Sequence, residues 1–293
     1  MIDPAADSRY NHGTLEARMV RRSAAPLTVF LLAVLSLAIP AAAQTPDPDR
    51  AVDPGQPDFT LSALPTTMRL PAGAFGFRLT HRFARPIASG STGDFFRDFF
   101  GFDSAARIGL ELRYGLRPGT QVAIYRTNDR AIQLSAQQTV MQQTGTRWIG
   151  VDAFVAVDGA DNFTEDYATS VGAVVSHLFP KQAAIYAHPI YVRNVAEGPA
   201  VDGVPDWSMC LGLGIRYRLG QSKVYVVAEA APQLGGLKDG VDHLTFAVER
   251  RAGAHMFQFT VSNNLGTSMR QVARGGVNSG DWYVGFNLTR RFY

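Results

Sequence analysis

Histidine is the side chain best suited to proton transfer near neutral pH, and this sequence contains six histidines. They are His12, His81, His177, His188, His243 and His255. The chain contains no Gly-x-Ser-x-Gly nucleophile motif and no His-Glu-x-x-His zinc motif. The histidines are also isolated from one another along the chain, which disfavours a metal site. The sequence therefore predicts no enzyme, no cofactor and no metal centre.

The single cysteine, Cys210, excludes an intramolecular disulfide framework, and we expect it to be a small buried side chain. The formal net charge is +3, and the basic residues, nearly all of them arginine, are scattered along the chain. Nucleic-acid binding usually requires a clustered basic patch. Composition thus predicts a protein without a nucleic-acid partner.

Charged residues that alternate with apolar ones suggest a different chemistry. In the stretch RIGLELRY, Arg107, Glu111 and Arg113 share one face, and the aliphatic residues and the tyrosine share the other. A period of two is the pattern of a β-strand with one polar and one apolar face. If the strands close into a membrane barrel, the polar face lines the lumen. The predicted lumen residues are Arg78, Arg82, Arg107, Glu111, Arg113, Asp152, Arg216, Arg218, Glu229 and Glu249.

Arginine outnumbers carboxylate in this set, so a pore with this lining would favour anions. The alternative is structural: arginine and glutamate pair across neighbouring strands and fill a narrow interior.

Segments with this alternation recur after residue 72, and most are close to the roughly 9–11 residues that a tilted membrane strand needs. They are residues 73–83, 105–114, 120–127, 130–138, 147–157, 166–179, 182–192, 207–219, 224–231, 243–249, 255–261 and 281–293. We therefore predict an all-β fold: a transmembrane, antiparallel, up-and-down β-barrel of about twelve strands, the even number typical of bacterial barrels.

The connections between these segments are sorted by length. The short turns GLRPG, QTGT, FPKQ, LGQSK and RRAG follow the even-numbered segments, and longer loops follow the odd ones, except for the short NDR. Outer-membrane barrels have short periplasmic turns and longer outer loops. A secreted soluble β protein, the competing interpretation, has no reason to sort its loops in this way.

Two of the long loops have distinctive compositions. Residues 91–104, STGDFFRDFFGFDS, form either a docking surface or constriction, or a loop that packs its own aromatic rings on the barrel rim. Residues 273–281, ARGGVNSGD, lack the helix and lysine context of a phosphate-binding loop. We expect the second to be a mobile loop.

The first 70 residues divide into three predicted parts. Residues 1–18 are an upstream mis-start, and residues 19–43 are a signal peptide with a basic start, an apolar stretch and a small-residue cleavage site. A signal anchor is the alternative, but the apolar stretch is about 13 residues against the roughly 20 that a span requires. Residues 44–70 are rich in proline and aspartate and are predicted to be a periplasmic lead-in; the alternative is a small plug in the barrel mouth. The barrel itself is predicted over residues 71–293.

The last segment alternates to the end of the sequence. A barrel must pair its last strand with its first, because unpaired backbone groups in hydrocarbon are costly. An aromatic terminal strand is also the expected signal for the barrel assembly machinery. Its residues are Trp282, Val284, Gly285, Phe286, Leu288 and Phe292.

Several stretches resemble an uncharacterised bacterial family described as a membrane-bound β-barrel domain. They are PTTMRLPAGAFGFRLTHRF at 65–83, FFGFDSAARIGLELRYGLRPGTQVAIYR at 99–126 and GFNLTRRF at 285–292. The matching positions are His81-Arg82-Phe83, Phe100-Gly101-Phe102-Asp103, Tyr114-Gly115-Leu116 and Gly285-Phe286-Asn287. The chain departs from the family near RTNDR. The resemblance implies a fold and a membrane location, and no activity.

We therefore expect a monomer in the outer membrane of a Gram-negative bacterium, in contact with outer-membrane lipid and delivered by the barrel assembly machinery. The predicted function is a narrow passive pore for small, anionic solutes. The alternative is a closed structural or docking barrel that binds a periplasmic or surface partner.

Overall fold

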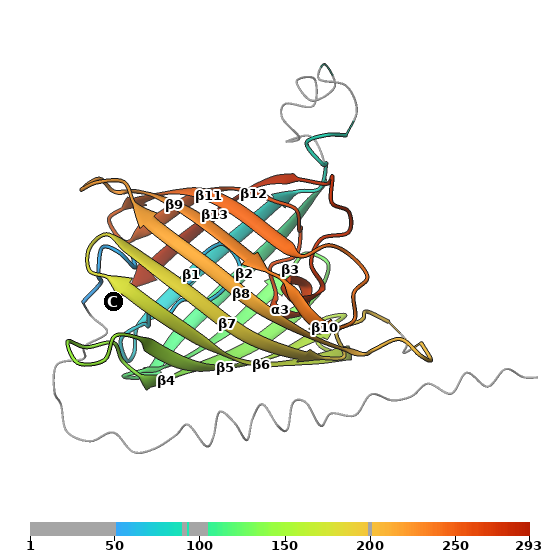
Figure 1. Cartoon of the computed structure of the whole chain (residues 1–293), viewed down its shortest axis with the longest axis horizontal. Coiled ribbons are helices and arrows are strands. Elements are labelled where there is room, and N and C mark those ends of the chain that lie inside the picture. Colours follow the sequence, from blue (N-terminus) through green and yellow to red (C-terminus); the bar gives the residue numbers. More distant parts are fainter. Residues whose placement is uncertain (1–50, 90–92, 94–104, 199–200) are drawn as a thin grey trace, which may run out of the picture.

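The computed structural model describes residues 51–89, 93, 105–198 and 201–293. These residues form one closed β-barrel (Figure 1). Its strands are β1 (Phe75–Phe83), β2 (Ala106–Arg117), β3 (Thr120–Thr127), β4 (Ile132–Met141), β5 (Gly150–Ala160), β6 (Glu165–Phe179), β7 (Ala183–Arg193), β8 (Trp207–Arg218), β9 (Val224–Ala231), β10 (Gln233–Gly236), β11 (His243–Ala252), β12 (His255–Ser262) and β13 (Tyr283–Phe292). Each of the twelve predicted segments is confirmed as a strand, and β10 prolongs β9 beyond Pro232.

Neighbouring strands pair antiparallel in chain order, and β13 pairs with β1 to close the sheet. Leu79 of β1 faces Leu288 of β13 in this register. Among the described strands only the short β10, which pairs with β8 alone, has an unpaired edge, and closure is the condition for a sheet that crosses hydrocarbon. The predicted pairing of the last strand with the first is therefore confirmed.

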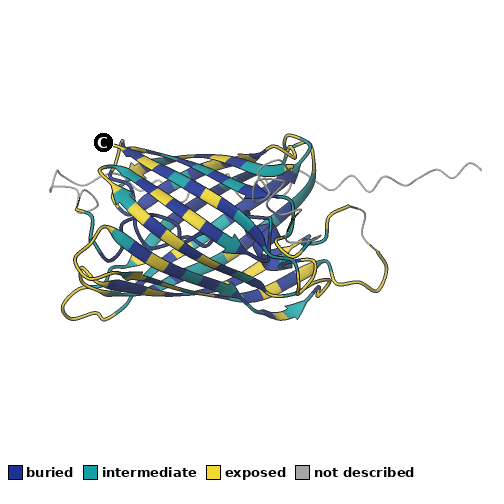
Figure 2. Cartoon of the chain, turned by 90° about the horizontal axis from the view of Figure 1, so that it is seen from above, coloured by how far each residue is buried: buried dark blue, intermediate teal, exposed yellow. Residues whose placement is uncertain are grey.

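Exposed and buried residues alternate along the strands of the wall (Figure 2), and the two faces have opposite polarity. On β2, Leu112 is 57% exposed on the outer face, whereas the next residue, Arg113, is 6% exposed on the inner face. A soluble barrel would bury the leucine and hydrate the arginine. The observed arrangement is that of a lipid-facing barrel, as the sequence predicted.

The described part of the expected periplasmic lead-in lies inside the barrel instead. Residues 55–70, here called the plug, are buried except for Arg69. They enter from the end where short turns join the strands, which we call the turn end; the opposite end is the loop end (Figure 1). Two backbone hydrogen bonds shape a tight reversal, from Leu61 N to Leu64 O at 2.8 Å and from Thr66 N to Phe59 O at 3.0 Å.

The proline-rich composition does exclude a regular ladder for the plug. It does not exclude burial, because side chains of the wall can satisfy the plug backbone. The structure thus corresponds to the alternative interpretation of this segment.

The loop before β13 contains helix α3 (Met269–Arg274), which ends at the start of the segment 273–281; the mobility of that segment stays a prediction. Ser268 and Gln271 form a capping box, with each side chain accepting from the other residue's backbone N–H. Met269 to Ala273 are buried against strands of the wall. The helix forms because its start is capped and its apolar residues find a dry surface inside the barrel.

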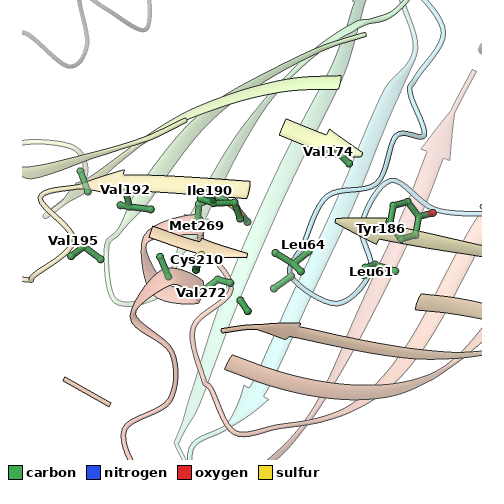
Figure 3. Packing of buried hydrophobic residues seen from close by; sticks show 14 of the residues in the cluster. Leu61, Leu64, Val174, Tyr186, Ile190, Val192, Val195, Cys210, Met269 and Val272 are labelled. Atoms are coloured by element: carbon green, nitrogen blue, oxygen red, sulfur yellow. The ribbon is translucent and has the colours of Figure 1, made fainter. Parts of the chain in front are cut away.

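The plug and α3 meet in one apolar cluster inside the barrel (Figure 3). Leu61 and Leu64 contribute from the plug, and Met269 and Val272 contribute from α3. Cys210 of β8 belongs to the same cluster and is 0% exposed, which confirms its predicted burial. Within the described residues, no helix has both the length and the apolar character needed to cross a membrane.

Several predictions concern residues outside the described part of the chain. These are the mis-start, the signal peptide and nearly all of the phenylalanine-rich loop at residues 91–104.

Candidate functional site in the lumen

Eight of the ten predicted lumen residues lie inside the barrel and are at most 6% exposed. They are Arg78, Arg82, Glu111, Arg113, Asp152, Arg216, Glu229 and Glu249. The other two lie at the rims: Arg107 lines a cavity at the loop end, whereas Arg218 corrects the prediction. Arg107 pairs with Asp129 at 2.9 Å at the loop end, and Arg218 donates to the carbonyl oxygens of Gln221 and Ser222 in a turn. Both alternate in phase with the inward-facing residues of their strands, but each lies at the end of its strand.

Arginines gather on three adjacent strands, in what we call the arginine sector: Arg78 and Arg82 of β1, Arg113 of β2 and Arg291 of β13. Glu111 is the carboxylate within this sector, 2.8 Å from Arg113 and 3.6 Å from Arg78. Sequence reasoning missed Arg291. It has the same parity as Asn287 and Thr289, so the alternation of β13 could have identified it.

Glu229 of β9 holds the tip of the plug. Its carboxylate accepts from three consecutive backbone amides, Ser62 N at 2.9 Å, Ala63 N at 2.9 Å and Leu64 N at 3.2 Å. His243 Nε2 lies 3.0 Å from its Oε1. Successive amides that converge on one anion form a nest, and hydrogen bonds to a charged acceptor are stronger than neutral ones. The tip is thus shaped to fit this carboxylate.

The same tip also contacts the arginine sector. Arg82 Nη2 donates to Ser62 Oγ at 2.9 Å, and Arg78 Nη2 donates to the Ser62 carbonyl oxygen. Asn287 Nδ2 donates to that carbonyl oxygen as well, at 3.2 Å. Ser62 therefore links β9 to β1 and β13 across the lumen.

A buried ion pair holds the segment of the plug that leads into the tip. Arg216 binds Glu249 through two hydrogen bonds of 2.8 Å, and both side chains are 0% exposed. The free donor capacity of Arg216 goes to the plug, with Nη2 donating to the Thr60 carbonyl oxygen at 2.6 Å. Gln258 joins the pair to the plug, because Nε2 donates both to Glu249 and to the Leu61 carbonyl oxygen.

Nearer the turn end, more wall residues bind the plug backbone. Arg291 Nη1 donates to the Pro57 carbonyl oxygen at 2.9 Å, and Gln137 Nε2 donates to the Thr66 carbonyl oxygen at 2.7 Å. The guanidinium of Arg113 lies 4.5 Å from the centre of the Phe59 ring. Contacts to the plug thus come from strands around the whole circumference.

Helix α3 is held from the loop end by similar means. Arg270 pairs with Asp166 at 2.9 Å and donates to the Val195 carbonyl oxygen at 3.2 Å. Gln133 of β4 accepts from Met269 N at 2.8 Å, and Gln233 donates to the Ala273 carbonyl oxygen at 2.7 Å.

Two cavities of about 290 Å³ lie on either side of the region where the plug and α3 meet. The cavity at the loop end is lined by residues including Arg107, Arg274 and Tyr283. The cavity at the turn end is lined by residues including Asp53 and Arg69. The two cavities share no lining residue. Among the described residues, no group of three His, Cys, Asp or Glu side chains is placed to hold a metal ion.

The terminal strand has the predicted faces. Val284, Phe286, Leu288 and Phe292 lie on the outer face, whereas Gly285 faces inward. Trp282 precedes the strand, and its ring stacks on Phe246 with 6.2 Å between centroids. The role of these residues as an assembly signal stays a prediction.

Comparison with known proteins gives a family and a fold. A family model described as a membrane bound beta barrel domain (DUF5777) matches residues 58–292. A solved structure of the NanC porin is similar, with 8% identity and a TM-score of 0.51 over 75% of this chain and 100% of that chain. The KdgM porin in complex with disordered oligogalacturonate has 7% identity and a TM-score of 0.46 over 75% and 99% of the two chains. No curated protein matches this sequence. The likeness to NanC shows a porin-type barrel fold.

Proposed function

The chain belongs to the family of membrane-bound β-barrel domains, and we propose that it is a narrow outer-membrane pore held closed by its own plug. The observation that carries this proposal is the set of contacts at Ser62, which joins Glu229 to the arginine sector across the lumen. In the proposed orientation the turn end faces the periplasm. The proposal includes export of the chain by the predicted signal peptide at residues 19–43.

The contacts that hold the plug support the proposal that the plug can leave the lumen. At the tip, Leu61 to Leu64 are uncharged. Their backbone and hydroxyl groups form hydrogen bonds with the charged side chains of the wall. Buried charges that lose their partners are costly, so the plug can leave only when water or a solute replaces it. The charged walls would then line an open path.

The solute that fits the opened lumen is small and anionic. The arginine sector now donates to carbonyl oxygens of the plug, and carboxylate or phosphate oxygens of a solute could take their place. Within the sector, four arginines face one glutamate, so a positive potential would select anions there.

A second candidate function is a permanently closed barrel that serves as a structural or docking element. The apolar cluster favours it, because Leu61 and Leu64 of the plug belong to the same buried cluster as Met269 and Val272 of α3. Separating these side chains would expose apolar surface to water, at about 25 cal/mol per Å².

Single-channel recording in planar bilayers distinguishes the two candidates. Three variants are needed because two segments fill the lumen: one lacking residues 51–68, one with residues 267–277 replaced by a Gly-Ser linker, and one with both changes. Heat-dependent gel mobility would verify that each barrel is folded. We expect rare openings in the wild type, and steady, anion-selective current in the double variant. A folded double variant that stays silent would overturn the pore and favour the closed barrel.

A further inference from the structure

A groove crosses the lipid-facing wall of the barrel from β5 to β11, with a volume of about 570 Å³. Small residues form its floor: Ala187 on β7, and Ala228 and Ala230 on β9. Leu213 of β8 lies between Ala187 and Ala230 in the strand register, and its side chain is 44% exposed. Leu213 therefore separates the alanine of β7 from the two alanines of β9, and the backbone lies close to the surface at each alanine.

The groove begins at the turn end in an aromatic cluster. Trp148 is 72% exposed, and its ring lies 5.8 Å from the ring of His177. His177 Nδ1 hydrogen-bonds to the Trp148 carbonyl oxygen, so that the imidazole is fixed at the rim. Arg147 precedes Trp148 in the chain and is exposed. Tryptophan at such a position is typical of the interface between lipid headgroups and hydrocarbon.

We propose that this groove binds one glycerophospholipid of the leaflet at the turn end, with an acyl chain over the alanines and the phosphate at Arg147 and His177. Because the wall faces lipid, an acyl chain of the bilayer is the group that contacts this surface. The alanine floor lets the chain contact the backbone closely and gain dispersion contacts. The arginine supplies charge complementarity for the phosphate. This proposal does not depend on whether the lumen conducts.

A second apolar hollow on the wall, of about 530 Å³, has only some of these features. It lies between strands β11 to β13, among the rings of Phe257, Phe259 and Phe286. Its lining includes the exposed Arg250, and the ring of His255 stacks on that of Phe257 with 6.1 Å between centroids, but the lining contains neither an alanine nor a tryptophan. The groove at β5 to β11 is therefore the better candidate for an ordered lipid.

Native mass spectrometry of the barrel purified in mild detergent tests the site. The groove is filled by the double substitution Ala228→Leu and Ala230→Leu. Ala153→Leu is the matched control, since Ala153 is an exposed alanine of β5 outside the groove. We expect the wild type and the control to retain phospholipid after extensive washing. The filled variant should retain about tenfold less, because several contacts between acyl methylene groups and the groove are removed.

The headgroup is tested by Arg147→Gln, with Arg290→Gln as the control at the same end of the barrel. We expect a severalfold loss of retained phospholipid for the first and none for the second. The proposal is overturned if the wild type retains no phospholipid, or if Ala153→Leu loses as much as the filled variant. A wild-type dimer that dissociates when the groove is filled would also overturn it, because the occupant would then be a second copy of the chain.

Discussion

The backbone N–H of Ser62 donates to Glu229 at 2.9 Å, although the two residues are 167 positions apart in the sequence. The same residue accepts from Arg78 through its carbonyl oxygen and from Arg82 through its hydroxyl. One uncharged residue thus satisfies a carboxylate on one strand and two guanidinium groups on another. Because of Ser62, the tip of the plug hydrogen-bonds to charged side chains of the lumen although the tip itself is uncharged.

Glu229→Gln should loosen the plug. A glutamine side chain offers one oxygen in place of two and presents N–H donors to three backbone amides that need acceptors. Leaving buried donors unpaired costs about 1–3 kcal/mol. We therefore expect the open probability in planar bilayers to rise about 5- to 150-fold.

Glu111→Gln is the matched control for that measurement. Glu111 is a buried lumen carboxylate that binds no amide of the plug in the described contacts and reaches the plug through Arg78 and Arg113, so we expect a smaller rise in open probability than for Glu229→Gln. Equal open probabilities for the two variants would show that the amide nest at Glu229 does not hold the plug.

A disulfide between the plug and the wall should lock the barrel closed. Thr67 Oγ1 of the plug lies 2.7 Å from Ser176 Oγ of β6, so cysteines at both positions would place their sulfur atoms near bonding distance. We expect the oxidised double-cysteine variant to show no openings, and a reductant to restore the wild-type frequency. The Thr67→Cys single variant is the control. If oxidation leaves the current unchanged, movement of the plug is not what opens the pore.

The strands were predictable because each one is long and carries a period of two, as in RIGLELRY at β2. The same parity identified the eight deeply buried lumen residues, but it did not show that Arg107 and Arg218 lie at the rims, because parity does not show where a strand ends. The plug was harder to recognise, since its backbone is satisfied by distant side chains such as Glu229 rather than by a local pattern. For α3, the Ser268-x-x-Gln271 spacing was a usable signal of a capped helix.

Ser268→Ala should loosen α3 without changing the barrel. The serine side chain accepts from Gln271 N, and loss of an N-cap costs about 1 kcal/mol. Arg270, a trypsin site, is 4% exposed, so cleavage there requires local opening. We expect cleavage at Arg270 to accelerate about fivefold, which corresponds to that free energy. Ser279→Ala, in an exposed part of the same loop, is the control. Equal cleavage rates for the two variants would contradict a capped, inserted helix.

Gly285→Ala should impair closure of the barrel. A Cβ at this position of β13 would lie 2.3 Å from the His81 carbonyl oxygen and 2.6 Å from Arg82 Cδ, and the His81 carbonyl belongs to β1, the strand that closes the sheet. Overpacking of this kind costs about 1–3 kcal/mol. The urea midpoint of the folded barrel, followed by heat-dependent gel mobility, should therefore fall. Gly280→Ala is the matched control, because a Cβ there meets no atom within 4 Å. An unchanged midpoint for Gly285→Ala would mean that β1 and β13 can separate enough to admit a methyl group, and that their close pairing is not needed for a stable barrel.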